Sequence, residues 1–218
     1  MAIGVLELAL TGLGRDSVFR EALGGPTVVV VDGQVHVSPG WNWLFVCLLY
    51  LASTAGAIDN APGWTRLTIA RGVSRRAWAG ARLAALAIGA LLYLAALLGA
   101  LGVHVILGPP RPFIRAGLLW DVGLWALGLI SVSWFAFALA LITRQVWPAF
   151  VVTALFLGIS RFGGPLSPYL PFAQWMAALH GLPGTLSVQA GVAYVTAWAM
   201  LCAAAVLWAA AARWDDLD

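Results

Sequence analysis

The sequence predicts an all-α polytopic membrane protein, a transmembrane helical bundle whose single domain covers residues 1–218. Of the 218 residues, 62% are hydrophobic and only 10% are charged, and the mean hydropathy is +0.91. An average soluble domain has about 25% charged residues, so this chain has too little polar surface to cover a water-soluble globule. A soluble enzyme, a disordered chain and a nucleic-acid-binding protein are therefore excluded.

Five apolar segments, separated by glycine, proline and arginine, are expected to form the helices: 41–58, 83–107, 117–142, 146–160 and 188–212. A helix of about 20 apolar residues crosses a hydrocarbon core of about 30 Å. The three longest segments therefore span with some tilt, and the two shorter ones need flanking residues. Residues 1–14 predict a short N-terminal helix that is either interfacial or an incomplete first span. The length thus allows about five or six spans.

Two segments between the spans are expected to be structured outside the membrane. The external loop 16–40 contains the run VVVVDGQVHV, whose Asp-Gly pair between β-branched stretches predicts a short β-hairpin. Segment 163–184 is bracketed by glycine and interrupted by proline, but its part 172–182 is apolar and too short to span. This pattern predicts a re-entrant or interfacial external helix, with a plain loop as the alternative.

The distribution of arginine predicts the orientation. The chain has no lysine, and the connection 59–82 holds five of its arginines: Arg66, Arg71, Arg75, Arg76 and Arg82. Because cytoplasmic loops are enriched in basic residues, this connection is expected in the cytoplasm and the protein in the inner (plasma) membrane. Tryptophan favours the headgroup level, which places Trp120 and Trp175 near the outer boundary and Trp78, Trp147 and Trp208 near the inner one.

The cytoplasmic connection 59–82 also has an amphipathic part. Pro62 and Gly63 end the preceding span, and Trp64, Leu67 and Ile69 then offer an apolar face beside arginines. This pattern predicts a short helix lying along the membrane surface. The alternative is a basic anchor that only fixes topology.

This connection resembles the cytoplasmic loop of ABC type-2 transporter permeases. The matching residues are Asp59, Gly63, Leu67, Gly72, Val73, Ser74, Arg75, Gly80 and Arg82. The family often has proline at the position of Gly72 and lysine at that of Arg82. It also usually has a cytoplasmic N-terminal interfacial helix and a full first span, where this chain offers only residues 1–14.

The resemblance implies that residues 63–76 form a coupling helix that docks in a groove of a separate ATP-hydrolysing subunit. The residues expected to take part are Asp59, Gly63, Trp64, Arg66, Leu67, Ile69, Arg71, Ser74, Arg75 and Arg76.

No catalytic constellation is present in the sequence. Without lysine the chain cannot form a P-loop, so ATP and Mg are expected on a partner ATPase, with no metal or cofactor on this chain. Haem or metal ligation would require two of His36, His104 and His180 to converge, and a headgroup-level position fits these histidines better.

The predicted spans lack a chain of buried acids, which disfavours proton or sodium coupling. Their weakly polar residues would suit a hydrophobic or amphipathic cargo; these are Tyr93, Ser131, Ser133, Thr153 and Tyr194. The same side chains could instead make hydrogen bonds between packed helices.

Together these features predict the permease subunit of an ATP-driven ABC-type exporter. The expected partners are two copies of an ABC ATPase subunit, a second permease that is identical or related, and the lipid bilayer. The main alternative is a non-transporting membrane scaffold or assembly subunit. A haem-carrying membrane subunit is a third possibility and depends on paired histidines.

Overall fold

The computed structural model of the protein describes residues 27–31, 34–38, 42–55, 72–107, 118–162, 169–180 and 187–212. The described elements are strands β1 (Thr27–Val31) and β2 (Gln34–Ser38) and helices α3 (Asn42–Ser53), α6 (Arg75–Leu107), α7 (Leu118–Thr143), α8 (Val146–Phe162), α9 (Pro171–His180) and α10 (Val188–Ala212). The predicted N-terminal helix over residues 1–14 lies outside these ranges.

Three of the helices are long and apolar enough to cross a membrane, which indicates a membrane-embedded helical protein. The qualifying stretches are Arg75–Gly99 in α6, Val122–Thr143 in α7 and Gln189–Ala212 in α10. Helix α8 contributes a shorter apolar stretch, Val146–Ser160, and α3 has only 12 residues. At about 1.5 Å per residue, α3 extends about 18 Å, which is shorter than a hydrocarbon core. Five or six spans therefore remain a prediction.

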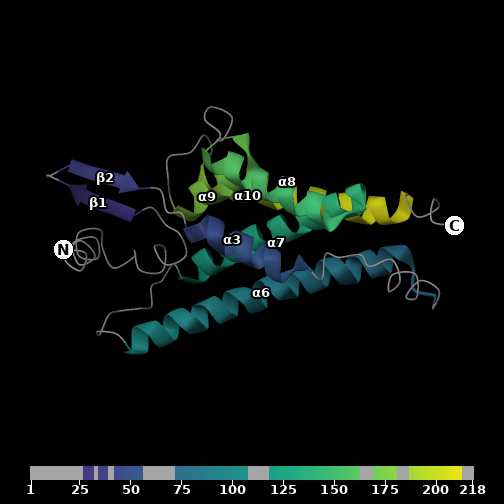
Figure 1. The fold of residues 1–218 in the computed structure, drawn as a ribbon, viewed down its shortest axis with the longest axis horizontal. Helices are drawn as coiled ribbons and strands as arrows, with labels where there is room; N and C mark the ends of the chain where they lie inside the picture. Colours follow the sequence, from purple (N-terminus) through teal and green to yellow (C-terminus); the bar gives the residue numbers. More distant parts are fainter. Residues whose placement is uncertain are drawn as a thin grey trace.

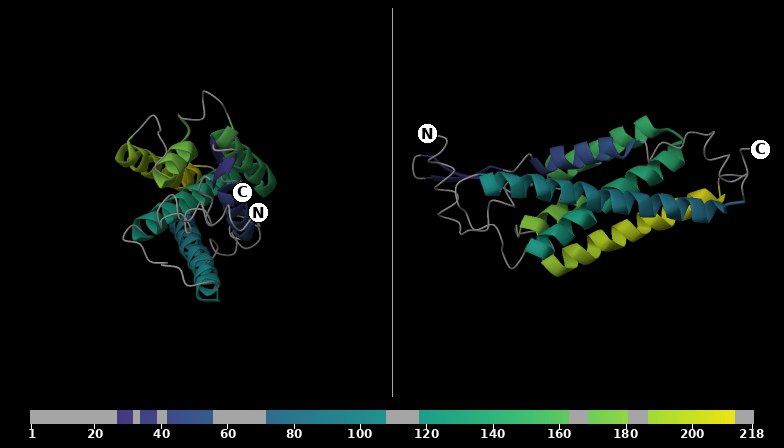
Figure 2. Two further views of the ribbon diagram at one scale, coloured as in Figure 1. Left: turned by 90° about the vertical axis from the view of Figure 1, so that its left-hand side faces the viewer. Right: turned by 90° about the horizontal axis from the view of Figure 1, so that it is seen from below.

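Consecutive long helices run in opposite directions along the bundle (Figure 1). The start of α6, the end of α7, the start of α8 and the end of α10 lie at one end, which we call the α6-start end. Strands β1 and β2 and helix α9 lie toward the opposite end. Seen from below in Figure 2, α3 and α8 run side by side on one flank, α10 lies on the other, and α6 passes in front.

Helix α7 is the centre of the bundle. It contacts α3, α6, α8, α9 and α10. Its apolar stretch is 56% buried, against 22% for that of α6 and 33% for that of α10. Since α7 is apolar all round, it can be surrounded by other helices, whereas α6 and α10 leave apolar faces uncovered by protein.

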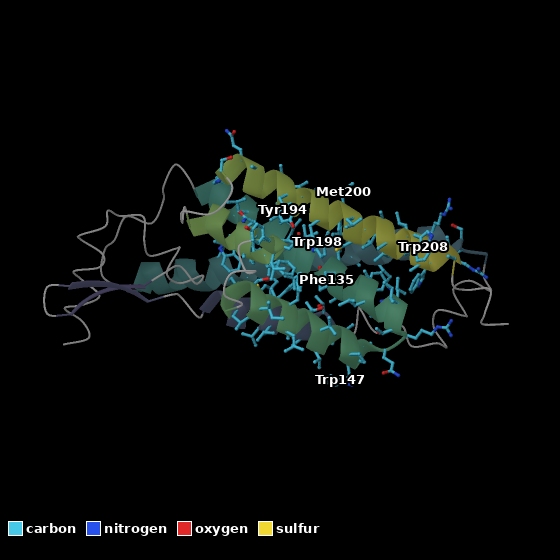
Figure 3. All side chains as sticks on the ribbon, turned by 90° about the horizontal axis from the view of Figure 1, so that it is seen from above. Phe135, Trp147, Tyr194, Trp198, Met200 and Trp208 are labelled. Carbon is cyan, nitrogen blue, oxygen red and sulfur yellow. The ribbon has the colours of Figure 1, made fainter. Side chains whose placement is uncertain are left out.

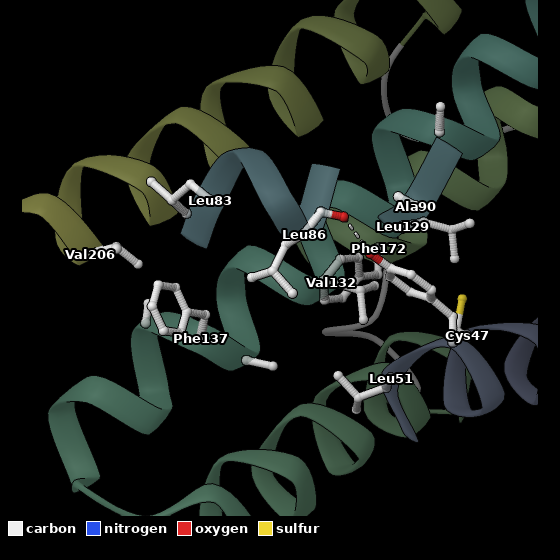
Figure 4. Packing of buried hydrophobic residues seen from close by; sticks show 14 of the residues in the cluster. Cys47, Leu51, Leu83, Leu86, Ala90, Leu129, Val132, Phe137, Phe172 and Val206 are labelled. Carbon is white, nitrogen blue, oxygen red and sulfur yellow. Dashed lines mark hydrogen bonds between the residues drawn. The ribbon is translucent and has the colours of Figure 1, made fainter. Parts of the chain in front are cut away.

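The core joins α3, α6 and α7 (Figure 4). Cys47 and Leu51 of α3 are buried with Leu86 of α6 and with Leu129 and Val132 of α7. Because these side chains are almost fully buried, α3 belongs to the bundle although it is short.

The two strands form an antiparallel pair whose register runs from Thr27 opposite Ser38 to Val31 opposite Gln34. Both strands fall within the segment 16–40, one before and one after the Asp-Gly pair in the sequence. The β-branched composition of this run is typical of strands.

Helix α9 is buried to a degree that its composition did not predict. It contacts α7, α8 and α10, and Pro171, Phe172, Gln174 and Trp175 are all buried. The plain-loop alternative for segment 163–184 is therefore wrong over 171–180. Trp175, which was expected near the outer boundary, is fully buried by the bundle and therefore does not face lipid.

Candidate functional site

The structure describes only the last part of the predicted coupling segment. Ser74, Arg75 and Arg76 lie at the start of α6. The other predicted coupling residues lie outside the described ranges; they are Asp59, Gly63, Trp64, Arg66, Leu67, Ile69 and Arg71. The amphipathic helix expected there stays a prediction.

The start of α6 has a well-defined local geometry. Gly72 has a φ of 85°, a left-handed conformation that glycine adopts at low cost. Two residues later the Ser74 hydroxyl accepts a hydrogen bond from the Ala77 amide at 3.2 Å, and the Ser74 carbonyl accepts one from the Trp78 amide at 2.9 Å. Ser74 is thus the N-cap of α6, which fixes where the incoming chain becomes helical.

Four arginines and two exposed tryptophans mark the α6-start end. Arg75, Arg76 and Arg82 belong to the first turns of α6, and Arg144 joins α7 to α8. The Arg82 guanidinium lies 5.7 Å from the centre of the Trp78 ring. Trp147 and Trp208 lie toward the same end (Figure 3), with exposed fractions of 81% and 64%.

This combination is typical of a membrane boundary, where arginine and tryptophan meet lipid headgroups. Trp78 differs from Trp147 and Trp208, because it is buried and packs against Phe137 with ring centres 6.1 Å apart.

Three of the predicted cargo residues are buried hydroxyls that bond to their own helices. Ser131 donates to the Leu127 carbonyl at 2.7 Å, and Ser133 donates to the Ile130 carbonyl at 3.0 Å. Thr153 donates to the Ala149 carbonyl at 2.7 Å. Each hydroxyl proton therefore has an acceptor within its own helix, as is common for serine and threonine in apolar helices.

The two predicted cargo tyrosines lie in different parts of the bundle. The Tyr93 hydroxyl donates to the Val46 carbonyl at 3.2 Å and so joins α6 to α3. Tyr194 is exposed and lies far along α10 from Trp208 (Figure 3), and its hydroxyl donates to the Tyr169 carbonyl at 3.0 Å. The structure thus does not bring the two tyrosines together.

Tyr93 is part of a paired contact between α3 and α6 that sequence analysis missed. The Tyr50 hydroxyl donates to the Leu86 carbonyl at 2.9 Å, in the direction opposite to the bond from Tyr93 to Val46. The two tyrosine rings are 5.3 Å apart between their centres. Each helix therefore supplies one donor and one carbonyl acceptor to the other.

Sequence analysis also missed an aromatic cluster that joins four helices. Its members are Phe135 of α7, Phe156 of α8, Phe172 of α9 and Trp198 of α10, and we call it the aromatic cluster. Between ring centres, Phe135 lies 5.2 Å from Phe156. It lies 5.6 Å from Trp198, which Figure 3 labels beside it. The sequence did not indicate this cluster, because the spacing of residues within one helix does not reveal rings that other helices contribute.

Metal ligands do not gather in the part of the chain that the structure describes, where no three His, Cys, Asp or Glu side chains lie together. Cys47 and Cys202 are both buried and free. The side chains of His36, His104 and His180, on which the haem alternative depends, lie outside the described residues.

The described parts of the chain thus show an arginine-rich end where α6 is capped and a central helix α7. They also show an aromatic cluster where α7, α8, α9 and α10 meet. No family model matches the chain, and no curated protein or solved structure matches it either.

Proposed function

We propose that this chain is the permease subunit of an ATP-driven ABC-type exporter that moves a hydrophobic or amphipathic cargo. In this proposal it works in the inner membrane with a second permease, identical or related, and with two ATPase subunits that bind ATP and Mg. The chain itself is not an enzyme. The site of coupling is the segment 59–82.

The observation that carries the proposal is the way the segment joins α6. The cap at Ser74 starts the helix at the arginine-rich end, and α6 then continues for 33 residues along the bundle. A continuous helix of this length extends about 50 Å. A displacement of the segment by a partner would therefore be carried along α6 to its contacts with α7 and α10.

The proposed topology follows from the same end of the molecule. Arg75, Arg76 and Arg144 lie at the α6-start end, and basic residues favour the cytoplasmic side. In the proposal α3, α6, α7, α8 and α10 each cross the membrane, with α3 and α8 completed by flanking residues. Strands β1 and β2 are then outside the cell, and α9 enters the bundle from that side as a re-entrant helix whose Phe172 packs against Phe156 of α8.

A second function, a non-transporting scaffold or assembly subunit, is supported by one observation. Ser131, Ser133 and Thr153 are buried and bond to carbonyls of their own helices. Hydroxyls used in this way contribute to helix structure without requiring a cargo. The two functions differ in whether the segment 59–82 binds an ATPase.

The deciding experiment changes the apolar face of that segment. The double variant Leu67→Asp with Ile69→Asp is compared with the matched variant Thr65→Asp with Thr68→Asp, which adds the same charge nearby and keeps both apolar side chains. An unpaired carboxylate in an apolar groove costs several kcal/mol of association. Membrane abundance and copurification of ATPase from the native host are measured for wild type and both variants.

The exporter proposal expects an ATPase to copurify with the wild-type chain and with the threonine variant, and to be lost from the Leu67/Ile69 variant at normal membrane abundance. The purified chain alone should not hydrolyse ATP. Normal abundance with undiminished ATPase binding would mean that the segment is only a topological anchor. The absence of any ATPase from the wild-type preparation would favour the scaffold.

A further inference from the structure

The indole nitrogen of Trp198 is a buried hydrogen-bond donor that has no acceptor among the residues that the structure describes. Two other indoles of the bundle are satisfied by helix carbonyls: Trp134 Nε1 donates to Leu83 at 3.0 Å and Trp175 Nε1 donates to Leu124 at 2.7 Å. A buried N–H without a partner carries its full desolvation cost, so native proteins seldom leave one unused. The Trp198 donor therefore requires an explanation.

The position of Trp198 along α10 restricts what its partner could be. It lies ten residues after the first residue of α10, Val188, or about 15 Å along a helix of 25 residues. In a helix that spans the membrane this is close to the middle of the hydrocarbon core. Lipid ester groups lie at the headgroup level and acyl chains have no acceptor, so ordinary lipid does not satisfy this donor.

The surroundings of Trp198 are aromatic and reach the surface of the bundle. The Trp198 indole is stacked on Phe156 of α8, with ring centres 6.0 Å apart and an interplanar angle of 18°. Phe172 of α9 is fully buried, and its ring centre lies 5.7 Å from that of Phe156. Phe135, Phe156 and Trp198 are each only half-buried.

The ring stack of Phe156 and Trp198 is a contact between α8 and α10. Both helices pack along α7 and α9, but they are not packed against each other along their lengths. A stack of two half-buried rings can separate while α7 holds both helices in place. The stack is thus a place where a flat molecule could enter from the membrane.

We propose that the aromatic cluster is a binding site for a neutral, flat, apolar molecule that carries one hydrogen-bond acceptor, and that the Trp198 N–H is its donor. The molecule would pack against the Phe156 ring and place its acceptor in the plane of the Trp198 indole, because the N–H bond points outward in that plane. An ionised molecule is excluded because no member of the cluster carries a charge to compensate its desolvation. The site goes beyond the proposed exporter function, since it exists whether or not the chain transports.

The test uses two small molecules of nearly the same shape. Acetophenone has a carbonyl acceptor, and α-methylstyrene replaces its oxygen with a methylene group. Both are titrated into the full chain, labelled with ¹⁵N at the tryptophan indoles and held in lipid nanodiscs. The Trp198 resonance is assigned as the one missing from Trp198→Phe, with Trp208→Phe as the matched control because Trp208 is exposed on the same helix.

We expect acetophenone to move the Trp198 indole proton downfield in a saturable way and to bind about fivefold more tightly than α-methylstyrene, as one net hydrogen bond predicts. Phe156→Leu keeps the donor but removes the stacked ring, so it should weaken both compounds. If Trp198→Phe fails to fold, Phe156→Leu also assigns the Trp198 resonance, because loss of the stacked ring changes the shift of that indole most.

Three results would overturn the proposal. The first is equal shifts with both compounds, which would mean apolar partitioning only. The second is no shift at Trp198 with either compound. The third is a resonance that already has a hydrogen-bonded shift before addition, which would mean that a water molecule satisfies the donor.

Discussion

The indole of Trp175 occupies the space where a side chain at position 128 would lie. A Cβ built on Gly128 overlaps the six-membered ring of Trp175, so the glycine lets α9 approach the backbone of α7 closely. The same indole donates to the Leu124 carbonyl and meets Trp125 edge-on at 5.2 Å between ring centres. One tryptophan thus attaches the short helix α9 to the central helix by shape and by a hydrogen bond.

Gly128→Ala should destabilise the protein by about 1–3 kcal/mol, because the added methyl group forces the buried Trp175 ring to move. The matched control is Gly123→Ala on the same helix, where a Cβ meets nothing within 4 Å. Thermal unfolding of the purified protein in detergent measures both. Equal midpoints for the two variants would contradict the close approach of α9.

Trp175→Phe should lower stability by about 1 kcal/mol from the lost hydrogen bond, with a further loss from the smaller ring. Trp208→Phe removes an indole that is 64% exposed and should have little effect. The free energy of unfolding is compared for the two variants under one condition. A larger effect at position 208 would show that Trp175 is not the anchor of α9.

Tyr50→Phe and Tyr93→Phe should each weaken the contact between α3 and α6, by about 0.6 kcal/mol, which is typical of hydrogen bonds between helices in membranes. Because the two rings are in contact, the double variant should lose an amount different from the sum. A double-mutant cycle on unfolding free energies measures the coupling. Strict additivity would mean that the two hydroxyls act independently.

The proposed topology predicts that the two ends of the bundle react from opposite sides of the membrane. Single cysteines are placed at the exposed residues Gln145 and Tyr169 in a background with Cys47→Ala and Cys202→Ala. An impermeant thiol reagent should label the cysteine at 169 in intact cells and the one at 145 only after disruption. Labelling of both cysteines from outside would contradict the topology, because it would mean that α8, which lies between them in the sequence, does not cross the membrane.

Hydropathy located the helices well, because burial in lipid or protein selects apolar residues in either case. The segment predicted at 188–212 coincides with α10, and the one at 146–160 lies within α8. The segment predicted at 83–107 begins too late, because α6 already begins at Arg75. Arginines in the first turns of a helix lower the local hydropathy without interrupting the helix. A helix start assigned from hydropathy therefore lies after the true start.

Contacts between helices could not be predicted in the same way. The burial of α9 depends on Gly128 and Trp175, which lie far apart in the sequence and show no shared period. The aromatic cluster likewise takes one ring from each of four helices. In a chain that is apolar on every face, periodicity does not distinguish a lipid-facing side from one that faces protein. The coupling residues from Asp59 to Arg71 remain predictions from sequence alone.

The directional bonds between helices described above share one chemical form. Tyr50, Tyr93, Trp134 and Trp175 supply the donors, and each acceptor is a main-chain carbonyl, at Leu86, Val46, Leu83 and Leu124 respectively. A main-chain carbonyl persists when the side chain of its residue is replaced. Mutation therefore removes these bonds readily only by replacing the tyrosine or tryptophan that donates. Descendants of this sequence are therefore free to vary the four aliphatic positions, within the limits of packing volume, while the four aromatic residues come under purifying selection.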